Sequence, residues 1–240
     1  YNAAIDVFVH EAPRDSALIS HDKIIVTPHL GASTVEAQEK VAVSVSEEII
    51  DILTNGTVEH AVNAPKMDLS NVDETVKSFV DLGTTIGEFA IQLLEGAPSE
   101  IKITFAGDLA TNDTSLITRT IVTNILKEDL GEEVNIINAL ALLNQQGVTY
   151  NIEKQKKHSD FSSYVELELT NDKDQIKIGA TVLAGFGPRI VRINDFSLDF
   201  KPNEYQIVTC HKDKPGIVGQ TGNLLGSHGI NIASMTLGRN

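Results

Sequence analysis

The sequence predicts the end of an open parallel α/β sheet, then an α+β unit, and finally a short βαβ unit. Near the start, two strand-like segments around Asp6 and before Pro28 precede a helical pattern. Further along, helical spacing of apolar residues changes at Val148 to the alternation that is typical of antiparallel strands. A strand–helix–strand pattern then begins at Tyr205. Helices first and strands later favour an α+β architecture for the middle of the chain.

Length and composition exclude several functional classes. The 240 residues could form one large domain or two small ones, and a net charge of −14 without a long basic cluster argues against a nucleic-acid partner. The single cysteine, Cys210, excludes an internal disulfide and a multi-cysteine metal site, and suits the cytoplasm. Neither a signal peptide nor an 18-residue apolar run is present, and Tyr1 stands in mid-strand. We therefore expect a soluble fragment of a longer protein, with no metal and no membrane partner.

The first segment combines a histidine with two acids. A β-branched run, residues 24–26, leads through Pro28 to His29, and ligands of open α/β sheets gather at such carboxyl ends of strands. The earlier strand contains Asp6, and Glu11 follows it. A carboxylate at one imidazole nitrogen fixes the tautomer and leaves the other nitrogen to exchange a proton. Spacing alone supports equally a Glu11–His29 acid–base pair and an ordinary fragment with a surface acid and a packed histidine.

A helix is predicted from Ser33 to Leu53. Ser33 and Glu36 match a capping box, apolar residues recur at helical spacing, and Asn55 and Gly56 form the stop. We expect the apolar stripe of this helix to pack in a core. Residues 57–69 are predicted to be a linker, broken by Pro65.

The middle unit is predicted to begin with a capping pair, Asn71 and Glu74, and a helix to Leu93. Gly83 and Gly87 in that helix are either two tolerated glycines or the place where another element approaches closely. The further predicted elements are a strand at 101–105, helices at 116–126 and 136–143, and antiparallel strands at 148–152, 164–169, 176–183 and 190–193. Gly185 and Gly187 form a turn, because Pro188 cannot donate the N–H group that a dinucleotide loop requires.

The last unit is predicted to be a strand at 205–210, a helix that Pro215 starts and that runs to about Ser227, and a second strand at 228–233. Gly229 permits the turn back toward the sheet. The pattern is therefore one βαβ unit.

The opening motifs carry a family resemblance. Asp6-Val7-Phe8, Glu11, Pro13 and the run Thr27-Pro28-His29-Leu30-Gly31 resemble the C-terminal signature of the NAD-dependent D-2-hydroxyacid dehydrogenases, in their long D-3-phosphoglycerate dehydrogenase form. Ala12 separates Glu11 from Pro13, which the family usually joins directly. The resemblance implies that His29 is the acid/base, that Glu11 is its partner, and that Asp6 bonds the nicotinamide carboxamide. The NAD-binding residues that it implies are Asp6, His29, Leu30, Gly31 and Ala32.

The resemblance also implies a domain order. Residues 1–32 would be the tail of a Rossmann-type NAD-binding domain, and 33–64 a crossover helix that returns to the substrate lobe. Residues 65–200 would be the α+β intervening domain, and 203–240 the first half of a ferredoxin-like ACT domain. In parts of the family the intervening domain is an effector or anion site, for which the basic candidates are Arg189, Arg192 and Lys201. Scattered basic residues are more often a solvated face than an anion site.

ACT domains are small-molecule sensors that pair across subunits. The resemblance implies L-serine as effector, held by Asp213 and Asn231 with His211 nearby, and self-association into a dimer or tetramer. It implies that the intact protein oxidises D-3-phosphoglycerate with NAD in L-serine biosynthesis, and that this fragment alone is inactive. The alternative is a non-catalytic regulatory and oligomerisation module that binds an amino acid. A different 2-hydroxyacid dehydrogenase with a similar sensor is a third hypothesis.

Overall fold

A computed structural model describes residues 2–11, 16–55, 57–58, 60, 62, 67–68, 74–203 and 205–238. The chain divides into two compact units, residues 1–62 with 66–71 and residues 63–65 with 72–240. Ala12, Pro13, Gly56 and Asn71, which belong to the predicted motifs, lie outside the described residues. Among the described helices, none has the length and apolarity needed to cross a membrane.

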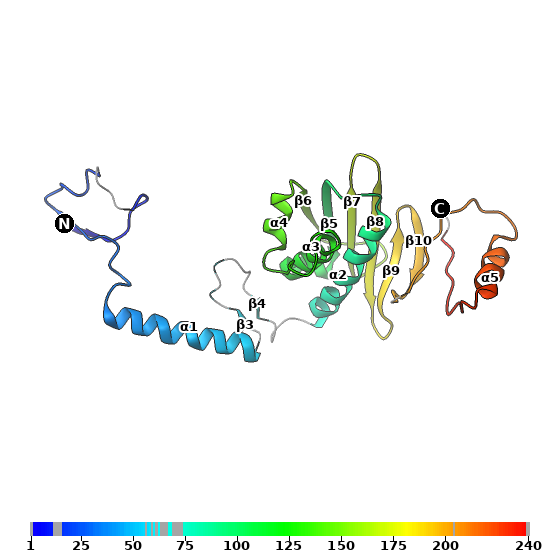
Figure 1. Ribbon diagram of the computed structural model, residues 1–240, viewed down its shortest axis with the longest axis horizontal. Coiled ribbons are helices and arrows are strands. Elements are labelled where there is room, and N and C mark those ends of the chain that lie inside the picture. The colour runs from blue at the N-terminus through cyan, green and yellow to red at the C-terminus, as the bar shows by residue number, and fades with distance from the viewer. Residues whose placement is uncertain are drawn as a thin grey trace. The chain divides into compact units, whose positions relative to one another are not determined.

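The first unit contains a small parallel sheet followed by a long helix (Figure 1). Strands β1 (Ala3–Ile5) and β2 (Ile24–Val26) pair in parallel, and helix α1 spans Val35–Asn55. Two-residue strands β3 (Thr57–Val58) and β4 (Met67–Asp68) pair antiparallel within the predicted linker. The parallel pairing aligns the carboxyl ends of β1 and β2, where Asp6 and Thr27 stand.

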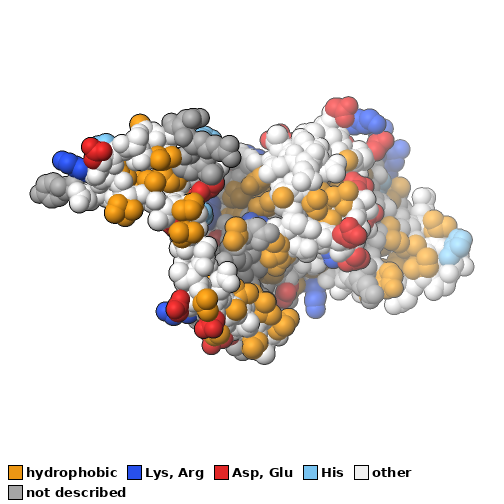
Figure 2. Space-filling view, turned by 60° about the vertical axis from the view of Figure 1, so that its left-hand side comes forward, with side chains coloured by type: hydrophobic (Ala, Val, Ile, Leu, Met, Phe, Trp, Pro, Cys, Tyr) orange, Lys and Arg blue, Asp and Glu red, His pale blue; other side chains and the backbone are white. Residues whose placement is uncertain are grey.

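Helix α1 begins at Val35, two residues after the predicted start at Ser33. Thr34, not Ser33, is the cap: its Oγ1 accepts a hydrogen bond of 3.2 Å from the N–H of Ala37. Ser33 instead closes the preceding turn, since its N–H donates to the carbonyl of Leu30 at 2.9 Å. The expectation that the apolar stripe packs in a core is also wrong for the described part of the unit, where Val41 is 54% exposed. Hydrophobic patches of this kind are visible on the surface in Figure 2.

The second unit is built on a six-stranded sheet with the order β10-β9-β8-β7-β5-β6 (Figure 1). Its strands are β5 (Glu100–Gly107), β6 (Thr149–Gln155), β7 (Ser163–Thr170), β8 (Gln175–Leu183), β9 (Gly187–Ile193) and β10 (Phe196–Phe200). Helices α2 (Glu74–Leu93), α3 (Ser115–Leu130) and α4 (Ala139–Gln145), with the short 3₁₀ helix η1 (Asp108–Thr111), supply the remaining elements. The α+β architecture that the sequence predicts for this unit is thus present, with a mixed sheet.

The core lies between one face of this sheet and the helices. Alternate strand residues such as Ile103, Phe105 and Leu167 are fully buried against Phe79 of α2 and Ile121 of α3. The opposite face of the sheet carries polar side chains at the intervening positions. This alternation is the pattern of a sheet that is covered on one side.

Two features of the sheet differ from the prediction. Strand β6 runs parallel to β5, not antiparallel, because a helical connection of η1, α3 and α4 returns the chain to the end of the sheet from which β5 started. Strand β10 was not predicted. It follows β9 through a two-residue connection, in which Asn194 adopts a left-handed φ of 50° that asparagine tolerates better than most residues.

Two glycine predictions are decided by the packing. Helix α3 crosses α2 at its glycines, since a Cβ on Gly87 would stand 2.8 Å from the carbonyl oxygen of Ile121. The interpretation of Gly83 and Gly87 as a site of close approach is therefore the correct one. Gly185 and Gly187, both with positive φ, lie at the β8–β9 hairpin, as predicted for a turn.

The predicted terminal βαβ unit is present only as its helix. Helix α5 spans Ile217–Ser227, but residues 205–210 and 228–233 form no strand in the described structure. A strand is stable only when a neighbour satisfies its backbone hydrogen-bonding groups, and residues 205–238 supply no such pairing. The prediction of a ferredoxin-like sheet in this segment is therefore wrong for the described residues, although its helix is in the predicted place.

Candidate functional site

The candidate site is a loop at the carboxyl ends of β1 and β2, and Asp6 holds it in place. Oδ1 of Asp6 accepts hydrogen bonds from the hydroxyl of Thr27 and from the N–H of Leu30, the latter at 2.7 Å. Oδ2 accepts the N–H of Gly31 at 2.9 Å, and the backbone carbonyl of Asp6 accepts the N–H of His29 at 2.9 Å. Asp6 therefore connects the end of β1 to four residues of the segment that follows β2, namely Thr27, His29, Leu30 and Gly31.

These contacts keep Asp6 ionised. The hydroxyl of Thr27, then the N–H groups of Leu30 and Gly31 and the nearby His29 ring, lower the pKa of the Asp6 carboxyl below its ordinary value. Sequence reasoning missed Thr27. The available signal was a hydroxyl residue at the last position before Pro28, where a strand ends beside an acid-bearing neighbour.

The loop presents His29 to Glu11. His29 has a left-handed φ of 55°, which is uncommon for a residue other than glycine and marks a constrained position. Its Nδ1 lies 3.1 Å from Oε1 of Glu11, and the two side chains are 57% and 45% exposed. An ion pair this exposed contributes little to folding stability. Its geometry instead suits a carboxylate that orients an imidazole and leaves Nε2 to exchange a proton with a ligand.

The contacts within the loop leave one acceptor position of the Asp6 carboxylate unused. A carboxylate has about four acceptor positions, and the loop uses three of those on Asp6, so one remains for a donor such as an amide N–H. Gly31 has no side chain beside that carboxylate, and a Cβ there would stand 3.3 Å from Oδ2 of Asp6. Within the described residues, no cluster of three or more His, Cys, Asp or Glu side chains could hold a metal ion.

The basic candidates in the second unit are engaged with acids or stand apart. Nε of Arg189 lies 2.7 Å from Oδ1 of Asp199, and Nη1 of Arg192 lies 3.9 Å from Oε2 of Glu166. Lys201 is exposed beyond β10. An anion at the two arginines would have to compete with these carboxylates.

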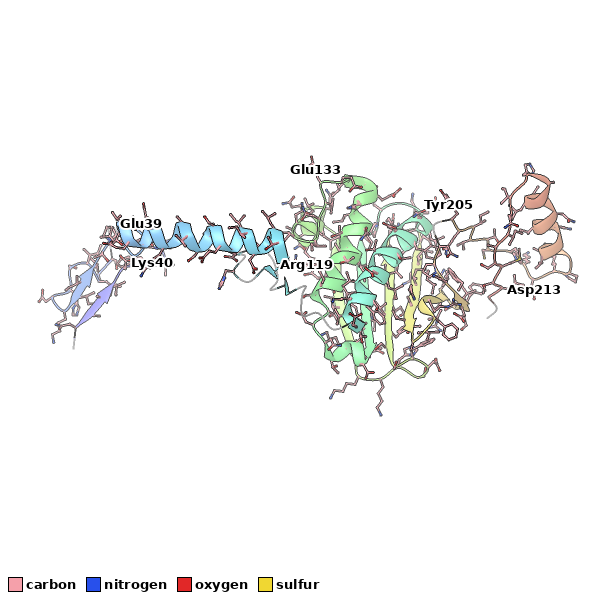
Figure 3. All side chains as sticks on the ribbon, turned by 90° about the horizontal axis from the view of Figure 1, so that it is seen from below. Glu39, Lys40, Arg119, Glu133, Tyr205 and Asp213 are labelled. Atoms are coloured by element: carbon pink, nitrogen blue, oxygen red, sulfur yellow. The ribbon has the colours of Figure 1, made fainter. Side chains whose placement is uncertain are left out.

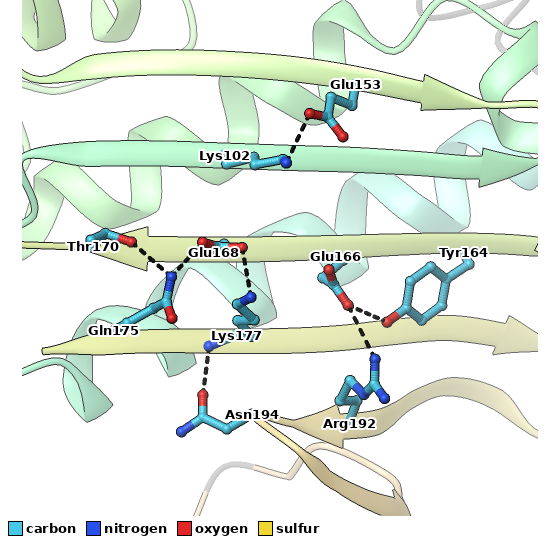
Figure 4. A network of polar contacts seen from close by, with 10 residues as sticks. All are labelled: Lys102, Glu153, Tyr164, Glu166, Glu168, Thr170, Gln175, Lys177, Arg192 and Asn194. Carbon is cyan, nitrogen blue, oxygen red and sulfur yellow. Dashed lines mark hydrogen bonds and ion pairs between the residues drawn. The ribbon is translucent and has the colours of Figure 1, made fainter.

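Arg192 belongs to a polar network on the uncovered face of the sheet (Figure 4). The hydroxyl of Tyr164 donates to Oε2 of Glu166 at 2.9 Å. Burial, and next the charge of Glu166, raise the pKa of the Tyr164 phenol above its ordinary value. Lys102 with Glu153 at 2.8 Å, and Lys177 with Glu168 at 3.2 Å, continue the row along the neighbouring strands. These alternating charges neutralise one another along the sheet.

The predicted effector residues lie on either side of α5. Asp213 precedes the helix (Figure 3) and Asn231 follows it, and both are exposed. Nδ1 of His211 lies 3.1 Å from the carbonyl oxygen of Lys212. Because the flanking strands do not form, these three residues stand in irregular segments.

Comparison with known proteins identifies relatives for the whole chain. A family model of the D-3-phosphoglycerate dehydrogenase intervening domain matches residues 75–194, which run from α2 to the end of β9. The chain is 34% identical to D-3-phosphoglycerate dehydrogenase of Bacillus subtilis over 99% of its own length and 45% of that protein. It is 36% identical to the Synechocystis protein of the same name, over 99% of this chain and 43% of the relative. It is 32% identical to the Archaeoglobus fulgidus protein of that name, over 99% of this chain and 45% of the relative. The chain thus spans less than half the length of these curated relatives.

Proposed function

The chain belongs to the D-3-phosphoglycerate dehydrogenase family, and from that membership we propose that the intact protein oxidises D-3-phosphoglycerate to 3-phosphohydroxypyruvate with NAD. The observation that carries this proposal is the pair of Glu11, which follows β1, and His29, which lies on the loop that Asp6 holds in place; Oε1 and Nδ1 are 3.1 Å apart. Acid–base chemistry at a substrate hydroxyl needs this arrangement, because the imidazole must be oriented before it can accept a proton.

In the proposed reaction, Nε2 of His29 accepts the proton of the substrate C2 hydroxyl. The C2 hydrogen leaves with its electron pair as a hydride, and NAD, when bound, supplies the hydride acceptor. Glu11 stabilises the resulting imidazolium through Nδ1. One hydride and one proton thus leave the substrate, two electrons and two protons in total, and the C2 oxygen becomes a carbonyl.

We assign Asp6 two roles. Its three loop contacts position His29, and its remaining acceptor position suits the carboxamide N–H of the nicotinamide. Leu30, Gly31 and Ala32 would border the cofactor, since the bonded N–H groups of Leu30 and Gly31 fix this part of the loop against Asp6.

The test is steady-state kinetics of the intact protein with three substitutions. We expect His29→Asn to lower kcat by about 10² to 10⁴ while NAD binding is retained, because general acid–base catalysis contributes on that scale. Glu11→Gln should cause a smaller loss. His10→Asn is the matched control, since His10 is exposed near Glu11 but is not part of the pair. Near-normal turnover of His29→Asn would exclude the proposed proton transfer.

We further propose that residues 65–200 are the intervening domain and that residues 203–240 carry an L-serine site with Asp213 and Asn231. The similarity to the relatives, which extends over 99% of the chain, supports this assignment. Calorimetric titration of the intact protein with L-serine, alongside Asp213→Ala and Asn231→Ala, tests it. Unchanged serine binding in both variants would refute the assignment without affecting the catalytic proposal.

A further inference from the structure

The outer edge of β6 is a regular sheet edge without a partner strand in the described part of the chain. On its inner side β6 pairs with β5 through seven consecutive residue pairs, from Glu100 with Thr149 to Ala106 with Gln155. The N–H of Thr149 donates toward β5, to the carbonyl of Ser99 at 3.0 Å.

Residues of a parallel ladder alternate in direction. Because Thr149 bonds toward β5, the N–H and C=O groups of Tyr150, Ile152 and Lys154 point away from the sheet. Three residues with outward-facing donors and acceptors are a template for another strand.

The usual protections of an edge strand are weak here. Charged side chains often guard an edge, but Nζ of Lys154 is held 2.7 Å from the carbonyl oxygen of Asn112, and Glu153 lies 2.8 Å from Nζ of Lys102. The charged groups of Lys154 and Glu153 are thus bound to partners within their own unit, and they do not guard the edge of β6. The other edge strand, β10, has only five residues, and its ladder shifts register between Ser197 and Phe200. Strand β6 has no such irregularity.

The apolar core reaches this edge. Tyr150 and Ile152 stand opposite Ile101 and Ile103, so their side chains share the helix-covered face with two fully buried residues. Tyr150 and Ile152 are nevertheless each 38% exposed. A strand added at the edge would remove this apolar surface from water, which is favourable.

We propose that β6 pairs antiparallel with β6 of a second copy of this chain, about a two-fold axis at Ile152. In that register Ile152 meets its own copy, Tyr150 meets Lys154, Asn151 meets Glu153, and Thr149 meets Gln155. All three outward-facing residues find a partner, and six main-chain hydrogen bonds form. No position places two like charges opposite each other, and the amide of Asn151 can donate to Glu153. The two six-stranded sheets become one.

Neighbouring registers are less favourable. An axis at Glu153 sets that carboxylate opposite its own copy, which is repulsive. An axis at Asn151 would pair Lys154 with Val148, whose N–H already donates to the carbonyl of Leu143 at 3.2 Å. The sequence of β6 therefore selects Ile152 as the centre.

Cysteine cross-linking of the complete 240-residue chain tests this register. In a Cys210→Ser background, Ile152→Cys places two thiols on residues whose Cα atoms are about 5.5 Å apart in a hydrogen-bonded antiparallel pair, within the disulfide range. Tyr150→Cys is the control, because its two copies would lie about 13 Å apart and cannot be bridged. We expect about tenfold more cross-linked dimer for Ile152→Cys than for Tyr150→Cys.

A mixture of Tyr150→Cys and Lys154→Cys should cross-link where neither does alone. Equal cross-linking at positions 150 and 152, or none at 152, would overturn the proposal, as would pairing of β6 with any other strand.

Ile152→Lys offers a second measurement in the Cys210→Ser background, since two lysines at the axis repel and should shift sedimentation toward smaller species. Phe186→Lys, at an exposed residue of the β8–β9 hairpin, is its control. An unchanged sedimentation profile of Ile152→Lys would count against the interface. Neither readout depends on dehydrogenase activity.

Discussion

Substituting Gly87 by alanine tests the packing of α2 against α3. A Cβ at Gly87 would lie 2.8 Å from the carbonyl oxygen of Ile121 and 3.2 Å from Cβ of Asn124. The first contact is to backbone, so relief requires a shift of α3 as a whole. Gly83, one turn earlier, is the matched control, because its nearest contact is Cγ1 of the Ile121 side chain at 3.3 Å. A side chain can yield by a few tenths of an ångström where a helix backbone cannot.

The two substitutions place the same methyl group on the same helix and differ in the atoms that it meets. Both should gain about 1 kcal/mol from the higher helix propensity of alanine. Overpacking a tight site costs about 1–3 kcal/mol, and we assign that cost to Gly87→Ala alone. Gly87→Ala should therefore be less stable than Gly83→Ala by about 1–3 kcal/mol. The assay is urea unfolding followed by far-ultraviolet circular dichroism. Equal stability of the two variants, or greater stability of Gly87→Ala, would refute the packing argument.

Three further predictions concern the core, the uncovered sheet face and helix α1. Phe105→Ala should destabilise the second unit by about 3–5 kcal/mol in urea unfolding, because a fully buried ring is replaced by a cavity; a loss below 1 kcal/mol would show that the site is not packed as described. The raised pKa of Tyr164 means that the unfolded chain loses this phenolic proton first, so stability should be unaffected below about pH 10 and should fall steadily as the pH rises above it. Tyr164→Phe should weaken that fall, and an identical pH profile would contradict the assignment. Thr34→Ala should lower the stability of α1 by about 1 kcal/mol in thermal melts, whereas Ser33→Ala, which removes no cap, should not.

The sequence predicted the elements of the second unit well, because their patterns are local. Helical spacing located α2 and α3, and alternation located β7 and β8, whose inward residues Leu167 and Ile178 are buried as expected. Strand β10 was not predicted, although Phe196, Leu198 and Phe200 alternate with polar residues as in a half-buried strand. The direction of β6 was also wrong, since strand pattern does not reveal which neighbour a strand takes.

At the candidate site, the motif singled out Asp6, Glu11 and His29, and the tertiary structure supplied the contacts between their segments. Glu11 and His29 are 18 positions apart, and only the parallel pairing of β1 with β2 brings them within 3.1 Å. Asp6 was expected to bind a cofactor, while its principal contacts are with Thr27, Leu30 and Gly31. Such contacts depend on loop geometry that no spacing rule contains.

The sequence by itself therefore located the helices and most of the strands of the second unit, and it singled out the side chains of the candidate site. Propensity, periodicity and capping act over a few residues, so they can be recognised without a fold. Only the tertiary structure decided the order of the sheet, the exact cap at Thr34, the loss of the terminal strands and the exposed edge of β6. These features depend on which hydrogen-bonding groups find distant partners, and that outcome is a property of the whole packed chain.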